Sequence, residues 1–544
     1  MAFSLGGETV SEKRDTVEFS GRRKIYTDVD RVTEDNVIFV LRQSLIAHEC
    51  NRMEIKRLIS FEKGNQPLMR EKSVRKDIDI KSISNLAHQI TEFWLGYFWG
   101  NHMAFVQKSD KRPKGSNPTD SDSAITLLNE MYDAEDMESK DQLLAYYTEI
   151  CGVCPQLIDI KRNPGEDDSL FDLVTLNPLY AFVVYYSNAY ERPAMGVSYS
   201  EFNNTRIFTC ITEDAVYRIK DAVKIVDGKE KDIFWHIDRS GESNPFGMVN
   251  IIEFERSTDR TGVFERQLDE LNALNILESD LCNDVSQTTQ ANWWGNDIEL
   301  DTDDEGNVKS PQAGQWILTK TNGSGKQPNI KGLVLNYDYT GVLANIQAKH
   351  DGILERTFTP KQTEQSGGST TGATSLSSGW TATEAVACKQ AQIIKCAYKK
   401  RNQLALLAIK KSSDVQPDNP LLSLKNSDID VRPIRQKTFD MATKINSLAT
   451  MVQNFVHPRV AMEAIDFFPN LAEAVEDSVP KMLEYQKTLL ESKKSGGNQP
   501  GENKNADPRQ QQDADDALKA KVNPDSKRIM SDSSDQTQNS PIQS

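Results

Sequence analysis

A glycine-rich stretch, GGSTTGAT (Gly367–Thr374), comes close to a signature for binding nucleotide phosphates. Phosphate-binding loops follow the pattern G-x-x-x-x-G-K-[ST], in which backbone N–H groups hold the phosphates and the lysine neutralises their charge. Here Ala373 stands in the lysine position, and the preceding residues, TPKQTEQS, do not read as a strand. The stretch is therefore interpreted as a mobile loop, and a degenerate phosphate loop is the alternative.

Other chemically suggestive patterns are also incomplete. DTDDEG (Asp301–Gly306) is similar to the start of a calcium-binding loop, but Gln312 occupies the twelfth position, where a bidentate Glu is required. GSGK (Gly323–Lys326) lacks the leading glycine and the following Ser or Thr of a phosphate loop. The histidines are spread singly, so no H-x-x-x-H zinc pair is present. We therefore expect no metal, no cofactor and no catalytic activity.

The cysteines predict reduced thiols rather than a disulfide framework. Their number, 7, is odd, and they are scattered over a long chain. Cys151 and Cys154 alone form a C-x-x-C pair, and a redox motif needs a strand before this pair and a helix starting at it. The order here is reversed, because helical DQLLAYYTEI precedes and strand-like PQLIDIKRN follows. We predict a helix-to-strand turn with two half-buried cysteines, and a redox pair is the alternative.

The composition is that of an acidic chain. Its 544 residues carry a formal net charge of −16, and 38% of them are hydrophobic. Proteins that hold nucleic acid tightly usually carry excess Lys and Arg, so strong binding is not expected, whereas contact with mobile DNA is compatible with this charge. No segment approaches the roughly 20 apolar residues of a membrane span, and the first residues lack a signal-peptide pattern. We therefore expect a chain that is neither secreted nor embedded in a membrane.

The periodicity of apolar residues predicts helical and β-rich regions in turn. Helical spacing occurs over about residues 36–60, 79–100, 124–150, 262–292, 339–358 and 382–411. Runs rich in Val, Ile, Phe and Tyr predict an antiparallel sheet over 155–255, a β-rich tip over 296–335 and one strand over 427–436. Residues 1 to about 35 are expected to be only partly ordered, and the polar residues from 494 onward to be disordered.

Finer signals mark individual helices. The segment 262–292 has an apolar stripe at spacings of three and four, made of Phe264, Leu268, Leu271, Leu274, Leu277, Leu281 and Val285. Thr381 followed by Glu384 has the spacing of a capping box, which predicts the start of the helix over 382–411. The last helical block is expected to break at Pro458, Pro469 and Pro480.

Three passages are similar, in type and in order, to elements of one known family. They are ITEFWLGYFWGNHMAF (Ile90–Phe105), NPFGMVNIIEFE (Asn244–Glu255) and HPRVAMEAIDFFPNLAEAVEDSVPKMLEYQ (His457–Gln486). With the helix–β tip–helix unit between them, they resemble the portal proteins of tailed bacteriophages. The resemblance covers about residues 36–490, and Asn250 departs from it, since the family usually has proline there.

The resemblance implies an α+β, elongated subunit of portal type, with a mixed α/β wing, a two-helix stem, a small β clip, a tunnel loop and a helical crown. Carried onto this sequence, the implied parts are an N-terminal arm at 1–35, a wing at 36–258, stem helices at 259–294 and 338–360, a clip at 295–337, a tunnel loop at 361–380, a long helix at 381–412, a wing return strand at 413–439, a crown at 440–493 and a disordered tail at 494–544.

The resemblance also implies a structural role. The expected assembly is a ring, implied to be dodecameric, at the portal vertex of the virion capsid, formed in the host cytoplasm. Double-stranded DNA would enter through it during packaging and leave through it during ejection. The implied partners are further copies of the chain, DNA bound without sequence preference, the major capsid protein, terminase and a head–tail adaptor, with no membrane contact. The alternative from another class is a nucleotide-dependent DNA-packaging enzyme that uses the degenerate phosphate loop.

The implied tunnel loop offers short uncharged hydroxyls, which touch a sliding phosphate backbone without fixing it. Its residues are Gly367, Gly368, Ser369, Thr370, Thr371, Gly372, Thr374, Ser375 and Ser377. Basic residues implied to lie near the channel are Lys309, Lys320, Lys326 and Lys331 in the tip, and Lys389, Lys395, Lys399, Lys400 and Arg401 on the following helix. Solvated helix faces and ion pairs between subunits are the alternative roles for these residues.

Overall fold

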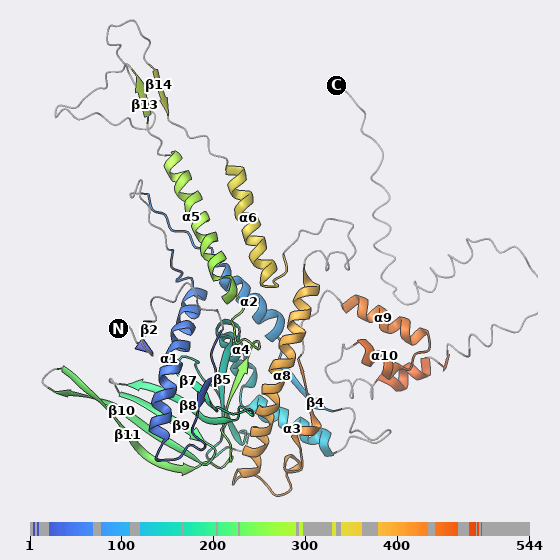
Figure 1. Ribbon diagram of the computed structural model, residues 1–544. Coiled ribbons are helices and arrows are strands. Elements are labelled where there is room, and N and C mark those ends of the chain that lie inside the picture. Colours follow the sequence, from blue (N-terminus) through green and yellow to red (C-terminus); the bar gives the residue numbers. More distant parts are fainter. Residues whose placement is uncertain are drawn as a thin grey trace, which may run out of the picture. The chain divides into compact units, whose positions relative to one another are not determined.

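Figure 1 shows a computed structural model of the chain. It describes residues 4–5, 8–9, 21–68, 78–108, 120–165, 167–202, 205–226, 229–289, 293–296, 329–332, 339–361, 379–433, 441–465, 478–485, 487–488 and 491. The chain divides into two compact units, the first with Met1–Ile445 and Asp466–Ala472, the second with Asn446–Ile465 and Glu473–Ser544.

The first unit contains long helices where the apolar periodicity predicts them. They are α1 (Val37–Glu62), α2 (Leu86–Trp99), α3 (Asp120–Ala134), α4 (Met137–Cys151), α5 (Leu268–Thr289), α6 (Tyr339–Arg356) and α8 (Trp380–Lys411). The single helix predicted over 124–150 is wrong, because two helices, α3 and α4, cover this region. The chain breaks at Asp136, whose φ of 50° lies in the left-handed region, which a continuous right-handed helix excludes.

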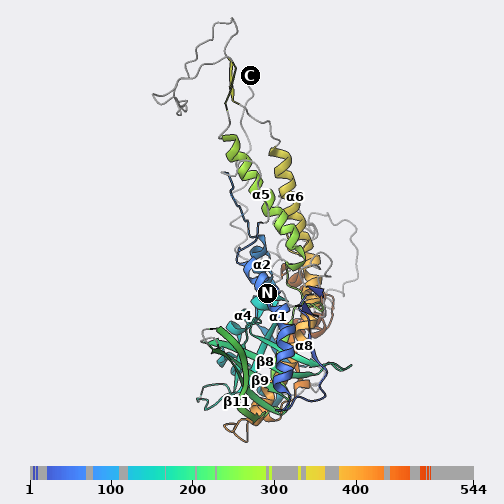
Figure 2. The same cartoon turned by 60° about the vertical axis from the view of Figure 1, so that its left-hand side comes forward.

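A six-stranded sheet forms one layer of this unit, in the order β11-β10-β9-β8-β7-β3. Its strands are β3 (Ile25–Thr27), β7 (Ala181–Tyr186), β8 (Pro193–Phe202), β9 (Thr205–Thr212), β10 (Ala215–Val226) and β11 (Lys229–Ser243). All neighbours are antiparallel except β3, which pairs in parallel with β7. Figures 1 and 2 show α1 running across this sheet, and Val40 and Leu41 of α1 share a buried cluster with Phe182 and Phe208.

The remaining strands form smaller sheets. They are a three-stranded antiparallel sheet in the order β12 (Ile251–Glu255), β5 (Val153–Ile160), β6 (Phe171–Thr175), and the pairs β4 (Met103–Gln107) with β15 (Ile429–Pro433), β13 (Trp293–Asn296) with β14 (Asn329–Gly332), and β1 (Ser4–Leu5) with β2 (Glu8–Thr9). The antiparallel pairing predicted over 155–255 is confirmed, but it is divided between two sheets. The strand predicted over 427–436 is also confirmed as β15.

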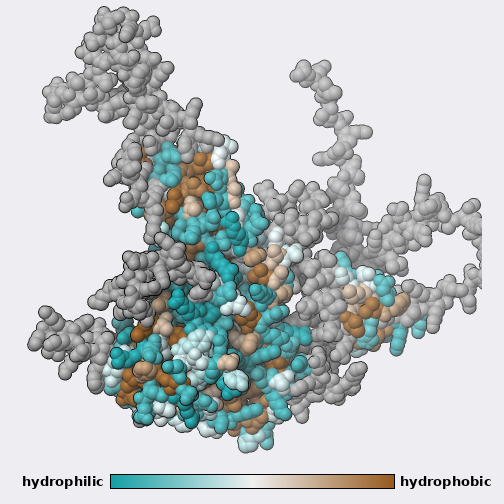
Figure 3. All heavy atoms as spheres, in the orientation of Figure 1, coloured by the Kyte–Doolittle hydropathy of each residue, from teal (hydrophilic) through white to brown (hydrophobic). Residues whose placement is uncertain are grey.

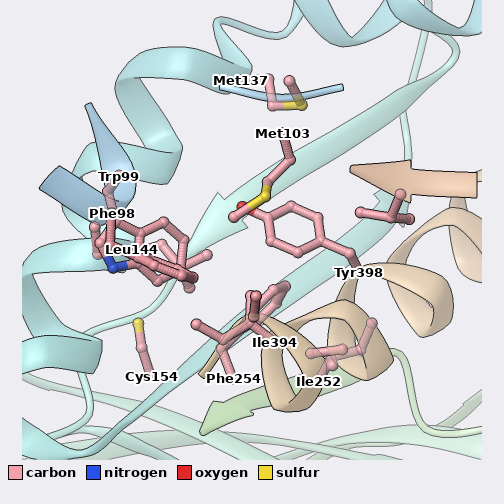
Figure 4. Packing of buried hydrophobic residues seen from close by; sticks show 14 of the residues in the cluster. Phe98, Trp99, Met103, Met137, Leu144, Cys154, Ile252, Phe254, Ile394 and Tyr398 are labelled. Atoms are coloured by element: carbon pink, nitrogen blue, oxygen red, sulfur yellow. The ribbon is translucent and has the colours of Figure 1, made fainter. Parts of the chain in front are cut away.

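The largest buried cluster joins α2, α4 and α8 to the three-stranded sheet. Figure 4 shows side chains from these elements turned toward one another, including Phe98, Leu144, Phe254 and Tyr398. Each of these four side chains is fully buried, and burying a large apolar side chain contributes roughly 1.5–3 kcal/mol. This core fixes α8 on the body of the first unit.

Helices α5 and α6 lie side by side and run in opposite directions (Figures 1 and 2). The predicted stripe on α5 is buried at Leu268, Leu271 and Leu274, but Val285 near the other end is 46% exposed. On α6, Leu343 is 54% exposed, and Figure 3 shows hydrophobic residues gathered beside hydrophilic ones on this helix pair. The stripe therefore exceeds what α6 covers within one chain.

A non-helical segment, 78–85, lies along α5 where the sequence predicts the start of a helix. The side-chain amide of Asn283 accepts a hydrogen bond from the Ile80 N–H (2.8 Å) and donates one to the Ile80 carbonyl (3.1 Å). One turn earlier, the Ser279 hydroxyl accepts from the Ser82 N–H (2.9 Å) and donates to the Ser82 carbonyl (3.1 Å). These bonds satisfy backbone groups that a helix would otherwise pair internally, so the helix begins later, at Leu86.

The second unit contains α10 (Pro458–Ile465) and most of α9 (Met441–Gln453). Val452, Ala461 and Met462 are buried in these helices. The break predicted at Pro458 is confirmed, because α9 ends at Gln453 and Pro458 starts α10, where its fixed φ and missing N–H favour the first turn. The predicted tail, 494–544, and Pro469 lie outside the described residues. No helix in the described part of either unit is long and apolar enough to cross a membrane.

Candidate functional site

Most residues singled out from the sequence as channel-facing lie outside the described part of the chain. This applies to the whole loop segment 362–378, to DTDDEG and GSGK, and to Lys309, Lys320 and Lys326. The backbone of Lys331 lies in β14, paired with Trp294 of β13, but the structure does not describe the position of the Lys331 side chain. The structure therefore brings none of these predicted site residues together, and their roles stay predictions.

The two ends of segment 362–378 are joined by direct contacts. The Thr383 hydroxyl, in the first turn of α8, donates a hydrogen bond to the Phe358 carbonyl (2.6 Å), which follows α6. The Trp380 ring packs 5.9 Å from Phe93 and 5.7 Å from Tyr97, both on α2. The segment thus begins and ends on a fixed base.

The predicted capping box at the start of α8 is wrong. The N-cap is Gly379, with φ at 86°, and no side chain caps the helix. Thr381 is exposed, and Glu384 accepts a hydrogen bond from the Tyr97 hydroxyl (2.5 Å) instead of capping. Glycine suits this position because the left-handed region is open to it without steric cost.

Helix α8 is strongly basic in an otherwise acidic chain. Glu384 is its single acidic residue, against seven Lys and Arg. Lys389, Lys399 and Lys400 are exposed. Lys395 is bound to Asp430 of β15 by an ion pair, so it is less available to a partner. Lys389, Lys399 and Lys400 form no ion pair with a described residue, although the charge of Lys400 acts on Glu255.

Arg401, expected among the channel-facing basic residues, is instead completely buried. Its Nη1 donates to Asp141 Oδ1 (2.7 Å), and its guanidinium lies 4.3 Å from the ring centre of Tyr398. Tyr132 encloses it on another side, and burial raises the pKa of Tyr132 to about 12. Arg401 is thus a structural residue, because it points from α8 into the core rather than away from it.

A second buried carboxylate, Glu149 of α4, ties α8 to the rest of the first unit. It accepts hydrogen bonds from Trp99 Nε1 (2.9 Å), from Arg256 Nε (2.7 Å) and from the Gln390 amide. Arg256 also lies 5.6 Å from the ring centre of Trp94. Sequence reasoning missed Glu149, whose only signal was an acidic residue inside the otherwise uncharged run LLAYYTEIC.

The C-x-x-C pair lies at the predicted helix-to-strand turn, between α4 and β5. Cys151 and Cys154 are fully buried rather than half-buried, and both thiols are free. Burial raises the pKa of both thiols, whereas a redox-active cysteine needs a lowered pKa and access to solvent. The redox alternative is therefore not supported. Among the described residues, no three His, Cys, Asp or Glu side chains form a group that could hold a metal.

Asn250, the departure from the portal pattern, has a structural use of its own. The side-chain NH2 group of Asn250 donates a hydrogen bond to the Ile158 carbonyl (2.7 Å). The main-chain carbonyl of Asn250 accepts one from the Ile158 N–H (3.1 Å). The residue thereby continues the pairing of β12 with β5 by one step. Asparagine at this position is compatible with the expected local fold.

The comparison with protein families identifies one family. The model of the family described as "Phage portal protein, SPP1 Gp6-like" matches residues 51–478. This span includes two of the three passages identified from the sequence and the first part of the third. A search of curated proteins found no significant match. The matched span covers well over half of the chain, and the chain therefore belongs to the SPP1 Gp6-like family of phage portal proteins.

Proposed function

We propose that this portal protein forms a closed ring, expected to hold twelve copies, at one vertex of the phage capsid. Double-stranded DNA passes through the ring during packaging and ejection, and the ring binds the major capsid protein, terminase and a head–tail adaptor. The observation that carries the proposal is the family match over residues 51–478.

The order of elements supports an assignment of parts. On this proposal the wing is 36–258 with the return strand in 413–439, α5 and α6 are the stem helices, the clip is 295–337, the tunnel loop is 361–380 and the crown is 440–493. The hydrogen bond between Thr383 and Phe358 supports a loop whose two flanking segments are held close together.

The charge of α8 supports a conduit for DNA. Lysines neutralise phosphate without reading sequence, and each contact adds to affinity and to its dependence on salt. A few lysines on one helix of an acidic chain give weak, sequence-independent contact, which suits DNA that must slide. We place Lys389, Lys399 and Lys400 at this contact.

Deletion of the tunnel loop tests the proposal. Removing Ser366–Ser378 is expected to leave ring assembly intact and to reduce packaged or retained DNA, as measured by nuclease-protected DNA per particle. A deletion of equal length within residues 494–544 is the control. Loss of the ring itself would contradict the loop assignment. ATP hydrolysis by the purified protein, abolished by mutating Gly372, would favour the packaging-enzyme alternative instead.

A further inference from the structure

The outer face of α1 carries a stripe of large apolar side chains that nothing in the described chain covers. Phe39, Ile46 and Met53 are 54%, 58% and 58% exposed. Their spacing of seven residues is about two helical turns, so they lie in line. The residues on the opposite side of α1, among them Val40 and Leu41, are the ones buried against the six-stranded sheet. A surface helix normally places polar residues opposite its buried face, so an apolar stripe there marks a contact surface.

The rim of this stripe is positively charged. Arg42, Lys56 and Arg57 are exposed, and none of them forms an ion pair with a described residue. The acids on the same helix already have partners: Glu49 pairs with Arg52 (3.0 Å), Glu54 shares Arg22 (3.0 Å) with Glu265, and buried Glu62 contacts His88 (2.6 Å). A partner for this face must therefore combine apolar surface with negative charge.

A matching acidic patch lies at the end of α3 and the start of α4. Its residues, all exposed, are Glu130, Asp133, Asp136 and Glu138. Glu138 is 3.1 Å from His102, and the other three carboxylates form no ion pair with a described residue. The half-exposed Leu143, on α4, supplies apolar surface in the same helix.

The two surfaces lie on different sides of the first unit. Figure 1 shows α1 at the left of this unit and α3 farther to the right, past β5. A ring requires two different patches on each copy, because every subunit meets its neighbours head to tail. A two-fold dimer through α1 would bring the charges of Arg42, Lys56 and Arg57 against the same charges of the partner, which is unfavourable.

From these observations we infer that the α1 stripe of one copy packs on the acidic α3–α4 patch of the next copy in the ring. The inference rests on the proposed ring and names the surfaces that close it. The apolar side chains supply the buried area, and the charged rims set which side of the neighbour is chosen.

Charge reversal in three variants tests the pairing. Arg42→Glu with Arg57→Glu, and separately Glu130→Arg with Asp133→Arg, are each expected to raise the protein concentration for half-maximal assembly by about tenfold or more. Combining all four changes restores opposite charges across the contact and is expected to recover most of the loss. Analytical ultracentrifugation measures assembly, and circular dichroism checks that each variant is folded.

An apolar variant and its control complete the experiment. Ile46→Ser with Met53→Ser is expected to weaken assembly, whereas Phe202→Ser, at a site that is 70% exposed on β8, is not. Rings that form equally well in every variant would overturn the assigned surfaces while leaving the proposed function intact. Normal rings that fail to enter capsids would assign the stripe to the capsid protein and also overturn the inference. Absence of rings in the unmodified protein would instead contradict the proposed function.

Discussion

At the scale of single residues, buried charge determines which substitutions this protein tolerates. Arg401 and Asp141 share one buried site, and removing one partner leaves the other uncompensated in a medium that solvates charge poorly. The Arg401 side chain is completely buried, so its charge does not reach the surface. Its contribution is therefore to the stability of the fold rather than to DNA contact.

We predict that Asp141→Asn destabilises the protein by about 3–5 kcal/mol, because the Arg401 guanidinium stays buried without its counter-charge. Urea unfolding followed by circular dichroism measures the change. Lys399→Asn, an exposed change on α8, serves as the control and is expected to move stability by less than about 0.5 kcal/mol. Equal unfolding midpoints for the two variants would show that Asp141 does not compensate Arg401.

Glu135 gives a prediction that depends on pH. Burial alone would raise the pKa of its carboxyl, but hydrogen bonds from Lys140, Lys161, the Leu173 N–H and Ser169 outweigh burial and lower the pKa to about 2. A carboxyl with a lowered folded-state pKa stabilises the protein above its ordinary value near 4.3, and this stabilisation is lost as pH falls toward 2.

Glu135→Gln is therefore expected to cost about 2–3 kcal/mol at pH 7 and less than half of that at pH 3. Thermal unfolding of both proteins at the two pH values measures the difference. A gap that stays constant between pH 7 and pH 3 would mean that packing, and not the charge of Glu135, makes the contribution.

The sequence could not separate these residues from their exposed neighbours. Lys399, Lys400 and Arg401 form one basic run, yet successive helical residues point about 100° apart, and only Arg401 faces the core. The difference depends on which side of α8 the three-stranded sheet covers, and that is a tertiary property. Glu135 gave no signal either, since it lies in the acidic run DAEDME.

At the scale of elements, two polar side chains of α5, Ser279 and Asn283, form a polar ladder: a row of hydrogen bonds to the backbone of segment 78–85, which is distant in sequence. Asn283 and Ser279 bind the backbone of residues 80 and 82, and both polar side chains are buried. The ladder attaches the chain before α2 to the proposed stem helix. Movement of α5 would therefore be transmitted to this segment.

We predict that Asn283→Ala accelerates hydrogen exchange at the Ile80 amide by about five- to tenfold, since a bond worth about 1 kcal/mol is lost and the amide is left without a partner. Mass-spectrometric exchange over peptides containing residues 78–85 measures the effect. The exposed change Asn345→Ala on α6 is the control. Unchanged protection at Ile80 would show that the ladder does not hold the segment.

Periodicity predicted the existence of α1, α5, α6 and α8, because each repeats apolar residues every three or four positions over several turns. It missed the break at Asp136, where one left-handed residue ends α3 without any glycine or proline. It also missed β3, whose three residues depend on a parallel partner far along the chain. The local spacing of apolar residues predicts amphipathic helices. Helix breaks and short strands depend on contacts with segments that are distant in the sequence.

At the scale of the whole molecule, the proposed conduit depends on weak contact with DNA phosphate. Replacing Lys389, Lys399 and Lys400 together by Gln is expected to reduce the dependence of DNA binding on salt, with a loss of up to about 0.9 in the slope of log affinity against log salt for each lysine that touches phosphate. Filter binding of duplex DNA at several salt concentrations measures the slope.

The matched control replaces three exposed lysines outside α8, namely Lys63, Lys81 and Lys108. It changes the net charge by the same amount, so it separates contact from overall electrostatics. An equal change of the salt slope in both triple variants would contradict the placement of α8 at the DNA contact.

The candidate site was predictable only in part. The order of the three passages indicated the family, because the types and spacing of their residues can be compared with a family pattern without knowing the fold. Which lysines face outward, and which apolar side chains of α1 stay exposed, depends on how α8 and α1 pack against their sheets.

The most direct test of the central claim is the assembly state of the purified full-length protein. Electron-microscope class averages and native mass should show closed rings of identical subunits. Twelve copies of the 61.2 kDa chain give about 730 kDa. A protein that remains a monomer, or stops at a two-fold dimer, under every condition that keeps it folded would contradict the portal account.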